Sequence, residues 1–144
     1  MERIKSLTLG TKLVLVSGVV FFLNLSLTWQ KIDVDFGPAG TAERMLDGWD
    51  AWGLLLGFLS LALVVLTVLV HLTDVELSET VRWDRITLAL GGVLLALTLV
   101  KNLLDAGSTV ASYVGIALAA AVFLGAWLNV REEAAARGSS AARA

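Results

Sequence analysis

Long apolar runs alternate with short polar segments along the whole chain, and this pattern predicts the fold. The four runs cover residues 13–29, 51–72, 86–104 and 110–130. Each run has about 17–22 residues, which at ~1.5 Å rise per residue crosses a hydrocarbon core of ~30 Å. Because backbone groups in lipid must be satisfied within their own segment, each run is expected to be a helix. The pattern predicts an all-α polytopic membrane protein, a bundle of four transmembrane helices in two hairpins.

The longest polar connection is the loop of residues 30–50, between the first two runs. Within it, "KIDVDF" alternates polar and apolar side chains, and Gly37 and Pro38 follow directly. A period of two predicts a short extended segment that ends at these two residues. Since one strand is unstable by itself, we expect it to lie on the membrane surface or to pair with a neighbouring chain.

Lysine and arginine predict the orientation of the bundle. One side of the membrane receives eight of the eleven: Arg3, Lys5, Lys12, Arg82, Arg85, Arg131, Arg137 and Arg143. The other side receives only Lys31, Arg44 and Lys101. The excess places both termini in the cytoplasm and the 30–50 loop outside. Residues 131–144 are expected to extend the last helix to about Arg137 and to fray from Gly138.

All five tryptophans fall at the predicted membrane interfaces, where an amphipathic ring prefers to lie. Trp29, Trp49 and Trp52 belong to the outer interface, and Trp83 and Trp127 to the inner one.

In "LDGWDAWG", Asp47 is expected to cap the second helix, and Asp50 to lie in its first turn beside the positive end of the helix dipole. This stretch is interpreted as an interfacial anchor. A recognition element that faces outward is the alternative.

Composition excludes several classes of function. The chain has no cysteine and one histidine, which excludes disulfides, thiolate nucleophiles and a zinc site built within one chain from these two residue types. The net charge of −2 gives no argument for binding to nucleic acid. Acidic side chains gather in the outer loop, among them Asp33 and Asp35, but they lack the spacing of a calcium loop. No metal, cofactor or catalytic residue is predicted.

The apolar runs carry no Asp or Glu at mid-membrane depth. This argues against proton-coupled carriers such as the small multidrug resistance proteins, which depend on a glutamate in the first span. Lys101 and Asp105 lie four residues apart with Asn102 beside them, and are expected to form an interfacial ion pair with the lysine reaching toward water. The alternative is a polar notch that binds an anionic lipid headgroup or a partner carboxylate.

His71 is the one histidine and falls at the inner end of the second run, three residues before Asp74. It is expected to be an interfacial, hydrogen-bonded side chain, with a pH-sensitive pair as the alternative.

Small residues recur at helical spacing and predict close helix packing. The second run has Gly53, Gly57 and Ser60, and the fourth has Gly115 and Ala119. The fourth run has two such faces, one for the bundle and one for a partner or a second copy.

Two resemblances add to this interpretation. The segment "LTLGTKLVLVSGVVFFL" resembles the first membrane helix of bacterial sensor kinases and chemoreceptors. The whole chain resembles small four-span membrane proteins of high-GC actinobacteria, through the loop after "LTWQ", the "GWDAWG" entry to the second run, the preference for arginine and the alanine-rich tail. That resemblance implies a bacterial cytoplasmic membrane and no established activity.

These patterns predict a non-enzymatic accessory or scaffold subunit in contact with the lipid bilayer and with another membrane protein or a second copy. The candidate contact residues are Trp29, Asp33, Asp35, Asp47, Trp49, Asp50, Trp52, Lys101, Asn102 and Asp105. A small oligomeric channel or carrier is the alternative, with a polar outer vestibule that includes Asn24. A membrane enzyme is least favoured, because no nucleophile–base arrangement is visible.

Overall fold

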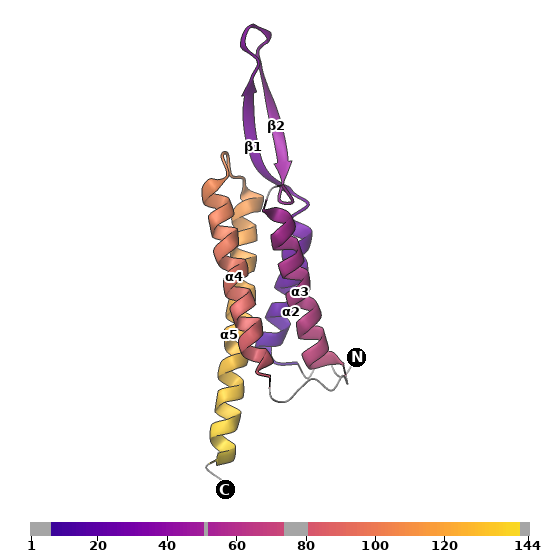
Figure 1. The fold of residues 1–144 in the computed structure, drawn as a ribbon, viewed down its shortest axis with the longest axis vertical. Coiled ribbons are helices and arrows are strands. Elements are labelled where there is room, and N and C mark those ends of the chain that lie inside the picture. Colours follow the sequence, from indigo (N-terminus) through magenta and orange to yellow (C-terminus); the bar gives the residue numbers. More distant parts are fainter. Residues whose placement is uncertain (1–6, 51, 74–80, 142–144) are drawn as a thin grey trace.

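A computed structural model describes residues 7–50, 52–73 and 81–141. Its helices are α2 (Leu9–Asn24), α3 (Gly53–Leu72), α4 (Trp83–Leu104) and α5 (Val110–Ala141), and its strands are β1 (Thr28–Asp35) and β2 (Thr41–Asp47), joined through the short 3₁₀ helix η1 (Gly37–Ala39) (Figure 1). Within the described ranges, α3, α4 and α5 are long and apolar enough to cross a membrane. The prediction of a mostly helical chain is confirmed, and a small two-stranded sheet is added to it.

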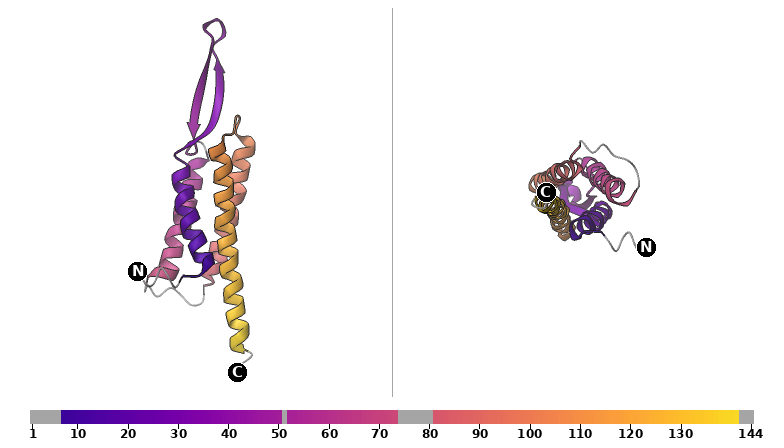
Figure 2. Two further views of the ribbon diagram at one scale, coloured as in Figure 1. Left: turned by 180° about the vertical axis from the view of Figure 1, so that it is seen from behind. Right: turned by 90° about the horizontal axis from the view of Figure 1, so that it is seen from below.

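The four helices stand side by side in a ring (Figure 2). Each helix packs against two neighbours, in the order α2, α3, α4, α5 and back to α2. The β1–β2 hairpin projects from one end of this bundle, and α5 extends beyond the other helices at the opposite end (Figure 1).

The first helix is shorter than its apolar run and begins earlier. Thr8 caps its start, since the Thr8 hydroxyl accepts a hydrogen bond from the Thr11 amide at 3.1 Å. Its 16 residues span about 24 Å, because the chain leaves the helix at Asn24. Two donors satisfy carbonyl groups at this end: the indole Nε1 of Trp29 reaches the Asn24 oxygen at 3.0 Å, and the Gly48 amide reaches the Leu25 oxygen at 2.7 Å.

The extended segment pairs within its own chain, which differs from both alternatives expected from the sequence. β1 and β2 are antiparallel, with Asp33 opposite Glu43 and Val34 opposite Ala42. The tip turns through Gly37 and Gly40, whose φ angles of 64° and 97° lie in the left-handed region. The partner strand "TAERMLD" has no polar–apolar alternation, so the pattern of residues 41–47 gave no signal for a strand.

The interior of the bundle is apolar and closely packed. Its fully buried side chains include Val14, Phe21, Leu56, Leu63, Leu94 and Val122. Many large apolar side chains instead face outward, such as Leu103, which is 83% exposed. Apolar residues on both the inside and the outside of a helical bundle are typical of helices surrounded by lipid.

The last helix continues without a break to Ala141 and does not fray at Gly138. Glu133 and Arg137, four residues apart on this helix, form an ion pair that supports the segment beyond the bundle.

Helices α2 and α5 approach each other closely at Gly10 and Gly125. A Cβ atom placed on Gly125 would lie 2.7 Å from the Gly10 oxygen and 2.9 Å from the Leu13 Cβ. Both distances are shorter than real Cβ contacts allow, so glycine at position 125 sets the spacing of these helices.

Replacing Gly125 with alanine is expected to lower the free energy of unfolding by about 1–3 kcal/mol, because the added methyl must displace the α2 backbone. Unfolding of the purified protein in detergent would measure the change. Gly138→Ala is the matched control, since Gly138 has no neighbour within 4 Å and alanine favours a helix. Equal stability of the two variants would contradict this account.

Candidate functional site

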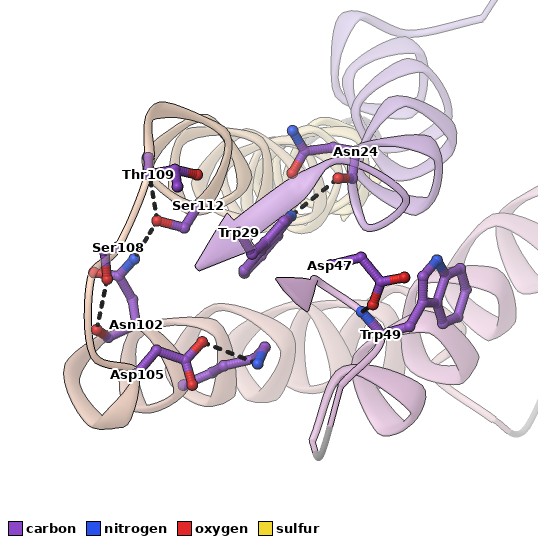
Figure 3. A network of polar contacts seen from close by, with 10 residues as sticks. Asn24, Trp29, Asp47, Trp49, Asn102, Asp105, Ser108, Thr109 and Ser112 are labelled. Atoms are coloured by element: carbon purple, nitrogen blue, oxygen red, sulfur yellow. Dashed lines mark hydrogen bonds and ion pairs between the residues drawn. The ribbon is translucent and has the colours of Figure 1, made fainter. Parts of the chain in front are cut away.

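The hairpin is attached to the bundle by the side chain of Trp29. This indole is fully buried and packs edge-to-face on Phe21, with ring centroids 6.2 Å apart. It also lies against Gly115 of α5, where a Cβ atom would collide with the ring. Figure 3 shows its bond to the backbone of Asn24. Trp29 is therefore packed inside the end of the bundle and does not face outward, and it ties β1 to α2 and α5.

The link between α4 and α5 adds a third extended segment to the base of the hairpin. The Lys31 amide donates to the Gly107 oxygen and the Thr109 amide to the Trp29 oxygen, both at 3.0 Å. Gly107 has a φ of 67°, and a side chain there would strike the Lys31 carbonyl. The "DAGST" composition of this link predicts a tight turn, but it does not predict the pairing of the link with β1.

The residues of the polar notch, the alternative interpretation of residues 101–105, take part in internal hydrogen bonds in the structure. Asn102 Nδ2 donates to the Ser112 hydroxyl, and that hydroxyl donates to the Thr109 carbonyl, both at 2.8 Å (Figure 3). The Ser108 hydroxyl donates to the Asn102 carbonyl at 3.3 Å. These bonds brace the α4–α5 link that supports β1, so they hold the base of the hairpin in place.

Lys101 does not reach toward water. Its side chain is 1% exposed, and its Nζ lies 2.9 Å from Asp105 Oδ2, although neither atom has a well-aligned hydrogen bond. A buried charge of this kind is tolerated only when its partner remains beside it.

The stretch at residues 47–53 forms a second attachment. The Asp47 carboxylate accepts from the Trp49 amide at 3.0 Å, and Trp49 Nε1 donates to the Ser26 hydroxyl at 3.1 Å. The Trp49 ring also packs edge-to-face on Phe22. Because α3 begins only at Gly53, Asp47 closes a turn before the helix and does not cap it.

Asp50 lies in the same turn and not in the first turn of α3, and its carbonyl accepts from the Gly53 amide at 2.9 Å. Trp52 is half exposed beside it, at 51%.

The small residues singled out from the sequence serve different contacts. Gly53 and Gly57 leave room for the preceding turn, at Gly48 and the Trp49 ring respectively, and not for another helix. The Ser60 hydroxyl crosses to α2 and donates to the Gly18 oxygen at 2.8 Å. Ala119 is buried in the core.

The remaining candidates do not converge on one centre. His71 Nδ1 lies 3.2 Å from the Thr67 oxygen, and Asp74 lies outside the described residues. Asp33 and Asp35 are exposed along the hairpin. Within residues 7–50, 52–73 and 81–141, no group of three His, Cys, Asp or Glu side chains is placed to hold a metal ion.

The two faces of the hairpin differ in chemistry. One face carries Ile32 and Val34, opposite Arg44 and Ala42. The other carries Lys31, Asp33 and Asp35, opposite Met45, Glu43 and Thr41, with an exposed Lys31–Glu43 ion pair at 2.9 Å. At the tip, Phe36 is 59% exposed. The hairpin thus presents a charged face and a less charged face, on which Arg44 lies beside Ile32, Val34 and Ala42.

Comparisons of the chain with protein-family models, with curated proteins and with solved structures found no match.

Replacing Trp29 with alanine is expected to cost about 3–5 kcal/mol of stability, because a buried aromatic is lost beside a glycine that cannot fill the space. Amide hydrogen exchange should rise across β1 and β2 before it rises in the helix centres. Trp52→Ala is the control, since that ring is half exposed. Unchanged protection of the hairpin in Trp29→Ala would show that the anchor lies elsewhere.

Replacing Lys101 with methionine is expected to cost about 3–5 kcal/mol, because it leaves the carboxylate of Asp105 without its partner. The double variant Lys101→Met/Asp105→Leu should recover most of this loss, since neither charge then remains. Unfolding in detergent measures the cycle, and Lys31→Met, at the exposed hairpin pair, is the control. A double variant as unstable as the single one would refute the pairing.

Proposed function

We propose that this chain is a non-enzymatic accessory subunit of a membrane protein complex and that the β1–β2 hairpin is its recognition element. One observation carries the proposal: the base of the hairpin is fixed by Trp29 and the α4–α5 link, while its upper half projects beyond the bundle (Figure 1). A fixed base holds the projecting half in one orientation, which lowers the ordering cost of binding.

The upper half of the hairpin has the properties of an incomplete sheet. Within the described residues, β2 pairs with β1 alone, so its outer edge is open. A two-stranded sheet is marginally stable in water, and an open edge is a template for a further strand. Ile32, Val34 and Phe36 add apolar surface beside that edge. These features support a partner that adds an extended segment to the hairpin.

The proposed setting is a bacterial cytoplasmic membrane with four spans and both termini inside. The bias of lysine and arginine supports this orientation. It places the hairpin outside the cell, so the partner is another membrane protein with a segment on that side. The shorter helix α2 packs against α3 and α5. This packing supports α2 as a span beside α3, α4 and α5, which makes four in all.

The alternative of a small channel or carrier has less support. It needs polar side chains that line a passage, and the vestibule was expected at Asn24, Lys101, Asn102 and Asp105. Lys101 and Asp105 pair with each other, and Asn102 is bonded to Ser112.

Site-specific photocrosslinking in native membranes tests the proposed function. A photoreactive residue at Phe36 is expected to capture one protein in stoichiometric amount, whereas the same residue at the exposed helix position Leu103 should capture lipid. Val34→Lys should reduce the Phe36 crosslink at least tenfold, and Asp33→Ser on the opposite face should not. Crosslinks from Phe36 to other copies of this chain alone would overturn the accessory role. Flux assays in liposomes would then test the channel or carrier alternative.

A further inference from the structure

The open edge of β2 presents a defined set of backbone groups. In an antiparallel pair of strands, residues that bond to each other across the pair alternate with residues whose N–H and C=O groups point away from it. The Lys31 amide donates to the Gly107 oxygen outside the pair, so Lys31 and its opposite residue Met45 are of the second kind. By alternation, so are Glu43 and Thr41 of β2. The N–H and C=O groups of these three β2 residues therefore face the open edge, where, within the described residues, no other strand pairs with them.

The direction of β2 limits the strand that can join it. β1 leads away from the bundle, and β2 returns toward it (Figure 1). Antiparallel pairing is slightly more stable per residue than parallel pairing. An antiparallel neighbour of β2 starts near the bundle and runs toward the tip of the hairpin. In the membrane setting of the proposed function, such a segment directly follows the outer end of a transmembrane helix of the partner.

The side chains of β2 determine which sequence fits beside it. An added antiparallel strand places its residues opposite Met45, Arg44, Glu43 and Ala42, in that order, and all four are exposed. Glu43 and Arg44 lie on opposite faces of the hairpin. A basic residue opposite Glu43 and an acidic residue opposite Arg44 thus form one cross-strand ion pair on each face. Apolar residues fit opposite Met45, which is 59% exposed, and opposite Ala42.

We propose that the partner adds to β2 an antiparallel strand whose residues are, in order, apolar, acidic, basic and apolar, directly after a transmembrane helix. This identification of the partner's chemistry rests on the proposed function. Both charged side chains of β2 are open to such a strand. Lys31 contacts only Oε1 of Glu43, whose side chain is 45% exposed. Arg44 is exposed and forms no ion pair with a carboxylate of the described residues.

A second copy of this chain fits the open edge less well. Two copies at the same depth in one membrane would bring β1 of one copy beside β2 of the other, in the register of the hairpin itself. Asp33 would then lie opposite Glu43, and like charges directly opposite each other are destabilising. Ile32 would leave Arg44 without a carboxylate. Two β2 strands related by an axis along the membrane normal would be parallel, which is the weaker pairing.

Peptide binding to the full-length protein in phosphatidylcholine nanodiscs tests the proposal. The probe is fluorescently labelled Thr-Leu-Glu-Lys-Val-Thr-Thr, and its control, Thr-Leu-Lys-Glu-Val-Thr-Thr, has the same composition and charge. Fluorescence anisotropy is expected to show about tenfold weaker binding of the control, because each charge then faces one of its own sign. The charge-swapped variant Glu43→Lys/Arg44→Glu should reverse this preference. Asp33→Ser, on the inner strand, should leave the preference unchanged.

Two further variants test the edge and the direction. Met45→Pro removes an N–H that faces the open edge and is not used by β1, so it should weaken peptide binding, whereas Met45→Leu should not. Because the chain has no cysteine, single substitutions report the direction. A peptide with an N-terminal cysteine should form a disulfide with Met45→Cys and not with Thr41→Cys. Amide hydrogen exchange of β1 shows that the hairpin is retained in each variant.

Four results would overturn the proposal: equal binding of the two peptides, no binding of either by the folded wild-type protein, an unchanged preference in the charge-swapped variant, or a disulfide formed with Thr41→Cys instead of Met45→Cys. The crosslinking experiment at Phe36 separates this failure from failure of the proposed function. Capture of another protein without the peptide preference would refute the sequence pattern alone. The peptide preference without any captured protein would refute the accessory role.

Discussion

Burial of the Trp29 indole is the interaction on which the rest of this structure depends. The ring fills a space that exists because position 115 of α5 has no side chain. Its indole N–H donates to the Asn24 carbonyl at the end of α2, and its backbone oxygen accepts from the amide of Thr109. Trp29 therefore connects the end of α2, the start of β1 and the α4–α5 link, so that the hairpin and the bundle form a single unit.

The helices were predictable from the sequence, whereas the direction of individual side chains was not. A run of apolar residues long enough to cross lipid forms a helix whatever its neighbours are, since lipid offers no other hydrogen-bond partner. An aromatic residue at the end of such a run gives the same sequence pattern whether its side chain faces lipid headgroups or packs inside the bundle. For Trp29, the outcome depends on Gly115, which is distant in the sequence. Lys101 was placed correctly beside Asp105, but its burial depends on the elements that cover it.

The second strand shows a different limit. β1 alternates polar and apolar residues because one of its faces is charged and the other is apolar. β2 lies farther from the bundle and its residues are nearly all exposed, so nothing constrains their order. Its position is set by pairing with β1 and by the glycine turn at the tip. Strand pairing through the backbone leaves little trace in side-chain types when neither face is buried.

The two ends of the bundle differ in how their charged side chains are arranged. At the hairpin end, Lys101 faces a carboxylate of opposite sign, and Asn102 has its partner in Ser112, so the polar groups serve the fold. At the other end, Asp84 and Glu133 lie close together, with Arg82 beside Asp84 and Arg137 paired with Glu133. Asp84 and Glu133 lie far apart in the sequence, and each resembles an ordinary interfacial charge until α4 and α5 bring them together.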